Sequence, residues 1–422
     1  MRTCITRQVL FGLLVTVWLS CGVNAEAYEP FSCATTNNNC FAGYDSACQQ
    51  SAWNFGGHVE SGLYVNRYGQ KNDYQNRGWN WPRQNPNGSI DTLSGNTDYL
   101  LNVRQSDLQV NQGWVFLEKK LSKRNCWDIG GRVDYVWGTD AMYMQSAGFE
   151  NNAGHGYWGT GDYYSAMAQM YAELGYGKLS VKLGKFLTPM GSDPIYSPDR
   201  FFYSLSKNFG VLPVTHTGAL ATLEVNRKLS VFGGWTQGYN EYFESSENNA
   251  VLAGFEYDLN SCTTIGYSFL WGKDTYATWT GSDRDYFINA LYLKRNLGCN
   301  WDYTFEWVLN NQNFEDTLGN GWNNVSYGIN NSLYYKINCN WSAGFRMEWM
   351  HTNDSWFSGD AADVYGLVLG ANWTPCSCIT LKPEIRYDSV HGDTGPFNLT
   401  KSSWQNAKGD QLAGGISAVV RF

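Results

Sequence analysis

The chain has 422 residues and a formal net charge of −8 at pH 7. This acidic balance argues against nucleic acid and against anionic lipid headgroups as partners. Its 45 glycines, with 16% aromatic and 16% charged residues, are unusual for a soluble enzyme. They are typical of an all-β binding protein or of a transmembrane β-barrel, whose rims carry aromatic girdles.

Residues 1–25 have the features of a secretory signal peptide. Two arginines precede an apolar run that is too short to span a membrane, so we expect export and cleavage after Ala25. A lipoprotein signal at Cys21 is the weaker alternative, because Trp18 stands where that signal has a small aliphatic residue. Cleavage removes two arginines and no acid, which changes the net charge from −8 to −10.

Residues 26–52 form a leader rich in Cys, Asn and Gln, and residues 53–422 are expected to form one barrel. No apolar stretch after residue 25 is long enough for a membrane helix. The tryptophan-rich stretch 79–88 could stack against sugars. An exposed loop with a Pro-Asn-Gly turn is the simpler interpretation of that stretch.

Apolar and polar side chains alternate along many short segments. In WDIGGRVDYVW (127–137), aromatic and aliphatic side chains share one face, and Asp128, Arg132 and Asp134 share the other. The segments 341–349 and 379–387 alternate in the same way. A period of two predicts strands.

Aromatic residues at the strand ends favour a membrane barrel over a soluble sandwich. Trp127 and Trp137 lie on one face of the same segment, roughly 23 Å apart at about 3.3 Å per residue and a tilt near 45°. The apolar band of an outer-membrane barrel is about 25 Å tall, with aromatic residues at each rim. We therefore expect the apolar face to meet lipid and the polar face to line a lumen.

The pattern predicts an all-β fold, a transmembrane antiparallel up-and-down barrel of about sixteen strands. Short turns alternate with long connections, so the short turns are expected on the periplasmic side and the long ones outside. The predicted strands are 53–68, 99–121, 127–138, 166–176, 178–188, 216–226, 229–238, 249–259, 262–272, 284–296, 299–310, 322–338, 340–351, 362–374, 377–389 and 409–422.

The chain stops at an aromatic residue, Phe422, at the end of an alternating segment. Such a strand resembles the signal that barrel-assembly machinery reads. An ordinary amphipathic last strand is the alternative.

Four sequence blocks resemble a known family. Between residues 113 and 243 the chain contains, in order, Leu117-Glu118-Lys119, Gly131-Arg132-Val133-Asp134, Gly184-Lys185-Phe186 and His216-Thr217-Gly218. These blocks resemble the putative β-barrel porin-2 family of exported outer-membrane barrels. The resemblance implies passive transport and identifies neither a catalytic residue nor a solute. The cysteine-rich leader and turns are not carried over from the family.

Nine of the eleven cysteines follow residue 25. Six fall at predicted short turns and three in the leader, which would emerge at the same rim. In an oxidising compartment they are candidates for disulfides, with at least one thiol left because nine is odd. A metal site is the alternative, but no His lies near these turns and no CxxC occurs, so we expect no metal and no cofactor. The candidates are Cys33, Cys40, Cys48, Cys126, Cys262, Cys299, Cys339, Cys376 and Cys378.

Charged side chains on the polar face are expected to line the pore. Acids outnumber bases and interleave with them, which predicts a hydrated pore with a slight cation preference. A charge on the lipid face would cost about 2–4 kcal/mol at the bilayer midplane, so these groups are expected to point inward. For each residue the alternative is a pair that only keeps the wall hydrated and rigid. The pore-lining candidates are Asp128, Arg132, Asp134, Glu173, Lys182, Glu306, Arg346, Glu348, Lys382, Glu384 and Arg386, with Lys178, Glu224, Glu256, Asp258, Asp302 and Arg421 as further inward charges.

The connection 188–214 is long enough to suggest a function. Its prolines stiffen it, and its aromatic residues are too apolar to be left in water. Folded into the lumen, it would form the constriction of the channel; a lid packed over the rim is the alternative. The residues expected to act there are Asp193, Asp199, Arg200, Phe201, Phe202 and Lys207.

Catalysis has little support in the sequence. The five histidines lie in different elements without metal-ligand spacing, and no GxSxG sequence occurs. A barrel lipase that pairs His216 with Ser204 or Ser206 is conceivable, but a rim or lumen position for His216 is simpler. We expect no enzyme activity and no catalytic residue.

The sequence predicts an outer-membrane channel of a diderm bacterium for passive diffusion of small hydrophilic solutes or ions. A plugged barrel with a structural or surface-binding role, in adhesion or glycan binding, is the alternative. Expected partners are outer-membrane lipid, the barrel-assembly machinery and small solutes, without nucleic acid. A homotrimer is expected by analogy with sixteen-stranded porins alone.

Overall fold

The computed structural model describes residues 53–67, 107–122, 127–152, 156–160, 163–238, 240–242, 248–276, 282–315, 321–353, 361–392 and 408–422. The expected signal peptide, the leader, the stretch 79–88 and Cys126 lie outside these ranges.

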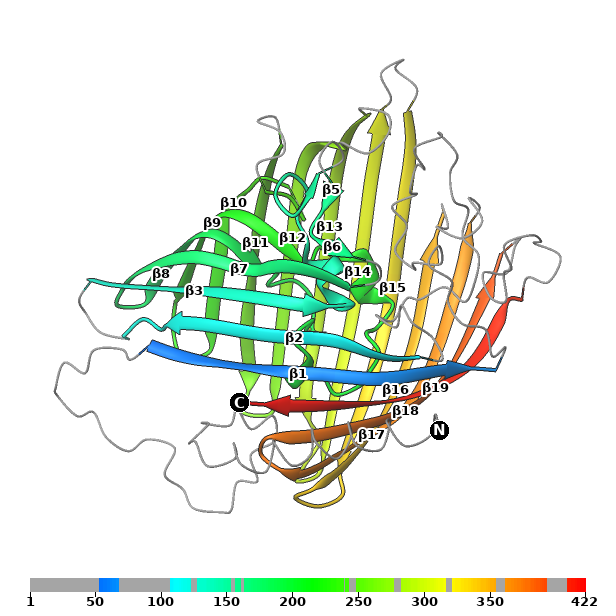
Figure 1. Ribbon diagram of the computed structural model, residues 1–422. Helices are drawn as coiled ribbons and strands as arrows, with labels where there is room; N and C mark the ends of the chain where they lie inside the picture. Colours follow the sequence, from blue (N-terminus) through cyan, green and yellow to red (C-terminus); the bar gives the residue numbers. More distant parts are fainter. Residues whose placement is uncertain are drawn as a thin grey trace.

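Sixteen strands form one closed antiparallel barrel, which confirms the predicted fold class. Strands that follow one another along the chain pair side by side, and β1 pairs with β19 to close the sheet (Figure 1). The wall strands are β1 (Trp53–Asn66), β2 (Leu108–Lys119), β3 (Trp127–Gly138), β7 (Tyr163–Tyr176), β8 (Leu179–Leu187), β9 (Thr215–Glu224), β10 (Leu229–Thr236), β11 (Asn249–Asn260), β12 (Thr263–Tyr276), β13 (Ser282–Asn296), β14 (Trp301–Glu315), β15 (Gly321–Lys336), β16 (Trp341–Thr352), β17 (Ala362–Cys376), β18 (Ile379–His391) and β19 (Asp410–Arg421).

The connections carry short elements of their own. β4 (Asn151–Asn152) pairs with β5 (Gly156–Tyr157), and β6 (Gly159–Thr160) pairs with β7. One-turn helices occur at η1 (Asp140–Met144), η2 (Ser197–Asp199) and η3 (Asn208–Val211). Within the described part of the chain, no helix is long and apolar enough to cross a membrane.

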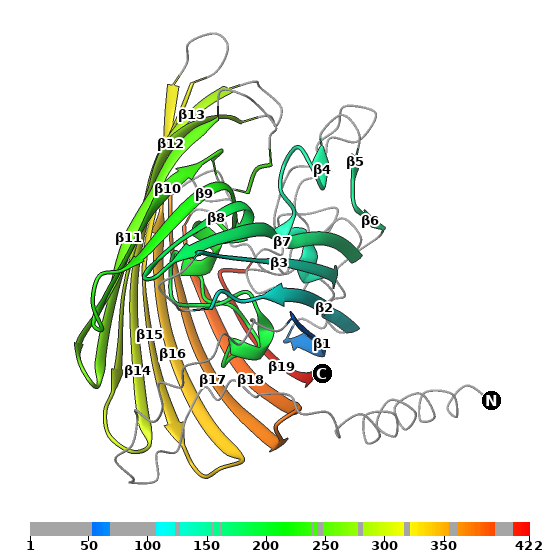
Figure 2. The same ribbon diagram turned by 90° about the vertical axis from the view of Figure 1, so that its left-hand side faces the viewer.

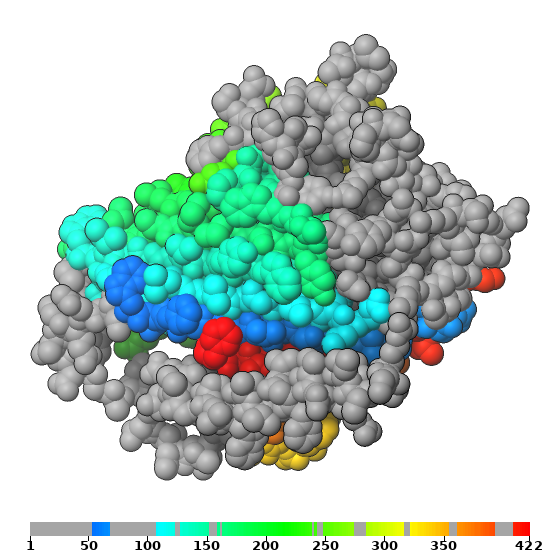
Figure 3. Space-filling model, viewed as in Figure 1, coloured from blue at the N-terminus to red at the C-terminus, as the bar shows by residue number. Residues whose placement is uncertain are grey.

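The two faces of the wall differ in chemistry, as strand β3 illustrates. The outward Trp127 and Ile129 are 75% and 61% exposed, whereas the inward Asp134 is fully buried. An outward apolar face is stable only against lipid, so the alternation fits a wall between lipid and a polar interior. Figure 3 shows the outer face of β1, β2, β3 and β7 as one continuous surface, running from blue through cyan to green.

The short turns lie at one rim of the barrel (Figure 2), and asparagine side chains close four of them. In each turn the Oδ1 atom accepts the backbone N–H two residues later, at 2.7–2.9 Å, which is an Asx turn. The four asparagines are Asn226, Asn260, Asn296 and Asn338. The strand ends that the longer connections join lie at the opposite rim, as predicted.

Strand β2 departs from its prediction. It begins at Leu108 rather than at residue 99, and residues 99–106 lie outside the described ranges. Glu60 pairs with Gln112 and Ser61 with Val110, so Asn111 is the extra residue of a β-bulge. The bulge breaks the alternation and turns two successive polar side chains toward the interior.

Candidate channel constriction

The connection between β8 and β9, residues 188–214, lies inside the barrel. It bonds to inward-facing side chains of β1, β14, β16, β18 and β19. Most residues from Ile195 to Val214 are buried. The connection therefore crosses the lumen instead of covering the rim.

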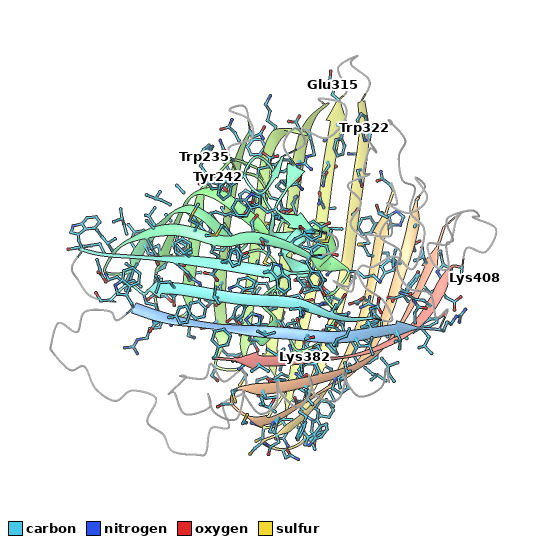
Figure 4. The ribbon with its side chains drawn as sticks, viewed as in Figure 1. Trp235, Tyr242, Glu315, Trp322, Lys382 and Lys408 are labelled. Atoms are coloured by element: carbon cyan, nitrogen blue, oxygen red, sulfur yellow. The ribbon has the colours of Figure 1, made fainter. Side chains whose placement is uncertain are left out.

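One acidic and two basic wall residues hold the segment around η2. The guanidinium of Arg200 lies 2.9 Å from the carboxylate of Glu60 on β1, and both side chains are fully buried. Lys382 of β18 donates to the carbonyl oxygens of Ser197, at 2.7 Å, and of Arg200. Figure 4 labels Lys382 well below Glu315 and Trp322, which mark the upper ends of β14 and β15. The second basic wall residue, Arg421 of β19, donates to the Pro198 carbonyl at 2.8 Å.

Arg346 of β16 holds the middle of the connection. Its two terminal nitrogens donate to the carbonyl oxygens of Ser204 and Leu205 and to the Ser204 hydroxyl, at 3.0–3.1 Å. Its Nε atom lies 2.6 Å from Glu348 on the same strand. From β18, Glu384 accepts the backbone N–H of Ser204 at 3.2 Å. Arg346 thus supplies the hydrogen bonds that water would otherwise give to these buried oxygen atoms of Ser204 and Leu205.

Lys207 extends this network along β18. It lies 2.8 Å from Asp388 on β18, and Arg386 bridges Asp388 at 2.8 Å and Glu348 at 2.7 Å. Burial lowers the pKa of Lys207, with the nearby Arg386 adding to the effect. The carboxylates of Asp388 and Glu348 oppose that shift.

Glu306 of β14 fastens the two ends of the connection together. Its carboxylate accepts the backbone N–H of Ser192, at 2.5 Å, and the amide of Asn208, at 3.2 Å. A side chain predicted to line the pore therefore serves as a capping group for the connection.

The bulge in β2 supplies a further set of contacts. Gln112 donates to the Ile195 carbonyl and to Asp140 at 2.8 Å, and Asn111 donates to Asp140 and accepts from Tyr203. Asp140 lies in η1, in the connection between β3 and β7. Burial raises the pKa of Asp140 to about 7.

Inward-facing glycines make room for the aromatic pair of the connection. A Cβ atom at Gly344 would lie 2.4 Å from the Phe201 ring, and one at Gly370 would lie 2.9 Å from the Phe202 ring. The two rings pack edge to face at 5.0 Å, and Arg346 stacks over Phe202 at 4.6 Å. Any larger wall residue would push these rings into the lumen.

Apolar clusters fill much of the remaining space around the connection. Met190, Val211 and Leu212 belong to a buried cluster with inward side chains of β9, β11–β14 and β16–β18. Ile195, Leu205, Phe209 and Val214 belong to a second cluster with η1, β2, β3 and β7. Of the six predicted constriction residues, Asp199 is exposed, Asp193 and Phe201 are half-buried, and Arg200, Phe202 and Lys207 are buried.

The predicted pore-lining charges fall into two groups. Those on β14, β16 and β18 contact the connection or, as Glu348 does, pair with the arginines that hold it. Those on β3, β7 and β8 pair nearer to the short turns: Asp128 with Lys119 at 3.1 Å, and Arg132 with Asp134 at 2.6 Å. Glu173 and Lys182 face each other across β7 and β8, whereas Lys178 lies in the turn between those strands.

Five acids lie on one register row around the inner wall. Successive pairs across β9 to β18 place them in line, separated by uncharged residues. Strand tilt makes the row slant through the lumen. Its acids are Glu224, Glu256, Glu306, Glu348 and Asp388.

Several contacts of the connection were not predicted. Glu60 and Asp388 lie on inward positions of predicted strands, so the alternation could have identified them. Gln112 and Asp140 could not be found in that way, because the first follows a bulge and the second lies in a connection.

A lipase would need a hydrogen bond between His216 and a serine hydroxyl, but the ring of His216 bonds to other groups. Its ring bonds to the Thr188 hydroxyl at 3.0 Å and to the Gly238 carbonyl at 3.4 Å. Ser204 contacts Arg346, and the Ser206 hydroxyl accepts the Phe209 N–H. This arrangement gives no support to a Ser–His pair.

Solved structures with similar folds are outer-membrane proteins. An anion-selective porin from Comamonas acidovorans has a TM-score of 0.52 at 10% identity, covering 88% of this chain and 99% of that one. OmpT of Vibrio cholerae, in its trimer form, has 0.54 at 12%, covering 88% and 99%. The channel DcaP of Acinetobacter baumannii has 0.53 at 11%, covering 90% and 100%. At such identities the likeness concerns the fold alone.

No curated protein matches the chain. The family model described as Putative beta-barrel porin-2, OmpL-like matches residues 54–422, and with the fold it indicates a porin-like barrel of the outer membrane. The chain therefore belongs to the Putative beta-barrel porin-2, OmpL-like family, as the sequence blocks between residues 113 and 243 suggest.

Proposed function

We propose that this protein is a non-enzymatic channel for passive diffusion of small hydrophilic solutes or ions, with residues 188–214 as its constriction. The observation that carries the proposal is the connection held inside a closed sixteen-stranded wall by buried ion pairs and hydrogen bonds. Sixteen strands enclose more space than side chains alone fill. A connection across that space sets the narrowest part of the path.

A slight cation preference is part of the proposal. The inward bases Arg346, Lys382 and Arg386 are buried against carboxylates and carbonyl oxygens. The exposed inner charges on β9, β11 and β13 are two acids, Glu224 and Glu256, and one base, Lys294. Water in the lumen is then in contact with more negative than positive charge, which favours cations.

A plugged barrel is the competing function, with a structural or surface-binding role. The two buried apolar clusters around residues 188–214 favour it, because they seal the connection to much of the wall. Both functions use the same fold and differ in whether water passes.

Single-channel recording in planar bilayers separates the two functions. For the channel we expect stable, ohmic steps on the nanosiemens scale, and a reversal potential of the sign for cations in a salt gradient. Silence from protein that migrates as a folded, heat-modifiable band would overturn the channel and favour the plugged barrel.

Export and assembly complete the proposal. Residues 1–25 would be removed on export, and the last strand, ending at Phe422, would be read by the barrel-assembly machinery. The similar OmpT of Vibrio cholerae is known in a trimer form, and a homotrimer is proposed here from that likeness. Exported to an oxidising compartment, the cysteines are expected to form disulfides.

A further inference from the structure

An open pocket of about 600 Å³ lies on the outer face of the wall, where β3 ends and β7 begins. The short strand β6 forms its third side. Its volume falls within the range of small-molecule sites, about 300–1,000 Å³. Aromatic rings and hydroxyl groups dominate its lining. The proposed channel makes no use of this pocket, which faces away from the lumen.

Strand pairing places a serine between two tryptophans in this pocket. Ser165 of β7 pairs with Trp137 of β3 on one side, and its N–H donates to the Trp158 carbonyl at 2.9 Å on the other. The three side chains therefore share one outward row, and Trp137 and Trp158 are 44% and 41% exposed. Neighbouring strands lie about 4.7–4.9 Å apart, so the two tryptophan backbones are roughly 10 Å apart. The result is a slot with an indole on each side and a serine as its floor.

Both sides of the slot are held in place. The ring of Trp137 stacks on Tyr163 at 5.0 Å with an interplanar angle of 12°. On the other side, the N–H of Trp158 donates to the Glu150 carbonyl at 2.9 Å. The carboxylate of Glu150 lies 2.7 Å from Lys185 of β8, and both side chains are fully buried. The slot is therefore preformed, because the connection that carries Trp158 is fastened to the wall.

The chemistry of the slot favours a hydrocarbon chain over a sugar or an ion. The hydroxyl groups of Tyr135 and Ser165 share a hydrogen bond of 2.8 Å, so the floor of the slot needs no polar partner. Among the described residues that line the slot, none is charged, and an ion would have no opposite charge to meet. Indole rings offer large apolar surfaces for contact.

The slot is also continuous with the lipid-facing wall. Beyond Tyr135, toward the middle of the wall, the next outward side chains are apolar and exposed. They are Val133 and Ile129 on β3 and Leu174 on β7. A chain that lies along this wall can enter the slot without passing a charged group.

We propose that this slot binds one acyl chain of an outer-leaflet membrane lipid, with Trp137 and Trp158 on either side of the chain and Ser165 beneath it. The site differs from the aromatic rim of barrels in general, because a connection supplies one of its sides. It therefore holds a particular lipid in place rather than a layer that exchanges freely. The inference goes beyond the proposed function and holds whether or not the barrel conducts.

Native mass spectrometry of the full mature protein tests the site, with dioleoyl phosphatidylethanolamine as the probe. The folded barrel is exchanged into tetraethylene glycol monooctyl ether and titrated with this lipid. We expect each chain to retain one lipid at low lipid concentration, before further lipids cover the rest of the wall. No retained lipid, or gradual binding without a first saturable site, would overturn the inference.

A substitution that fills the slot sharpens the result. Ser165→Phe keeps the backbone bonds and should lower retention of the first lipid several-fold. The matched control is Ser389→Phe, since Ser389 also faces outward, two residues from the outer end of β18, and lies outside the slot. The control should retain the lipid as the wild type does, and heat-modifiable migration shows that both variants fold. Equal retention in all three proteins would show that lipid covers the wall without a particular site, which would overturn the inference.

Maltoheptaose separates a lipid site from a sugar site, because this soluble oligosaccharide has no acyl chain. We expect that it leaves the retained lipid in place. Binding of maltoheptaose to the wild type but not to Ser165→Phe would assign the slot to sugars and would overturn the inference. Conductance is recorded on the same preparations. A conducting barrel without the retained lipid would overturn this inference alone, and a silent barrel with it would overturn the proposed function alone.

Discussion

Arg346 is the wall residue with the largest number of bonds to the connection. Replacing it with Met would leave two carbonyl oxygens buried without this donor and would remove the cation that lies 2.6 Å from the Glu348 carboxylate. Losing one partner of a buried ion pair costs about 3–5 kcal/mol. We expect Arg346→Met to lower the urea midpoint in detergent micelles and to raise single-channel conductance.

The matched control for this variant is Lys178→Met, because Lys178 is exposed in a short turn. Its replacement should change neither quantity measurably. If both variants changed the urea midpoint and the conductance equally, Arg346 would not be what holds the connection in place.

The buried carboxyl of Asp140 makes the stability of the folded protein depend on pH. Its folded-state pKa is about 7 because of burial, while an unfolded carboxyl titrates near 4. Between these values the folded state keeps a proton that the unfolded state has lost. The contribution of Asp140 to stability is therefore largest below pH 4 and is lost as the pH rises through about 7.

The variant Asp140→Asn removes this titration while keeping the shape of the side chain. We expect its urea midpoint in micelles to fall less than that of the wild type between pH 5 and pH 8. Parallel pH profiles of the two proteins would show that Asp140 titrates normally.

Individual contacts were predictable only in part. The alternation of polar and apolar residues predicted that Glu306, Arg346, Lys382 and Arg386 face inward, because a charge on the lipid face is costly. Their partners depend on where the connection lies inside the barrel. Arg200 and Glu60 are separated by 140 residues, and nothing local in the sequence joins them.

At the scale of elements, the connection depends on inward glycines of the wall. Gly344→Val would place atoms where the Phe201 ring lies, and overpacking of this kind costs about 1–3 kcal/mol. We expect the displaced connection to become accessible to trypsin at Arg200 and Lys207, which are buried in the wild type.

Gly233→Val is the control for this proteolysis. The nearest atom to a Cβ atom at Gly233 is 3.8 Å away, so a side chain fits there. Its connection should resist trypsin as the wild type does. Resistance of the Gly344→Val variant as well would show that the ring can move without loosening the connection.

The strands were the most predictable elements. Alternation, short turns and strand-end aromatics are local signals, and they identified all sixteen wall strands. The bulge at Asn111, the short helix η1 and the two-residue strands β4–β6 were missed, because each is too short to show a period in the sequence.

At the scale of the whole molecule, barrel closure involves the last residue. Gly57 and Phe422 exchange two backbone hydrogen bonds of 3.0 Å where β1 meets the end of β19. We expect Phe422→Ser to keep these bonds and to refold in detergent, but to reach the outer membrane several-fold less well. The amount of heat-modifiable, folded barrel in isolated outer membranes, compared between the variant and the wild type, measures this difference. Unchanged assembly would exclude Phe422 as part of the signal.

Conductance of the wild type beside a variant lacking residues 192–208 tests whether residues 188–214 constrict an open channel. The deletion removes the connection while the wall strands β8 and β9 remain. If residues 188–214 constrict an open channel, the wild type conducts in ohmic steps and the variant conducts several-fold more. Equal conductance in the two proteins would show that residues 188–214 do not constrict the channel.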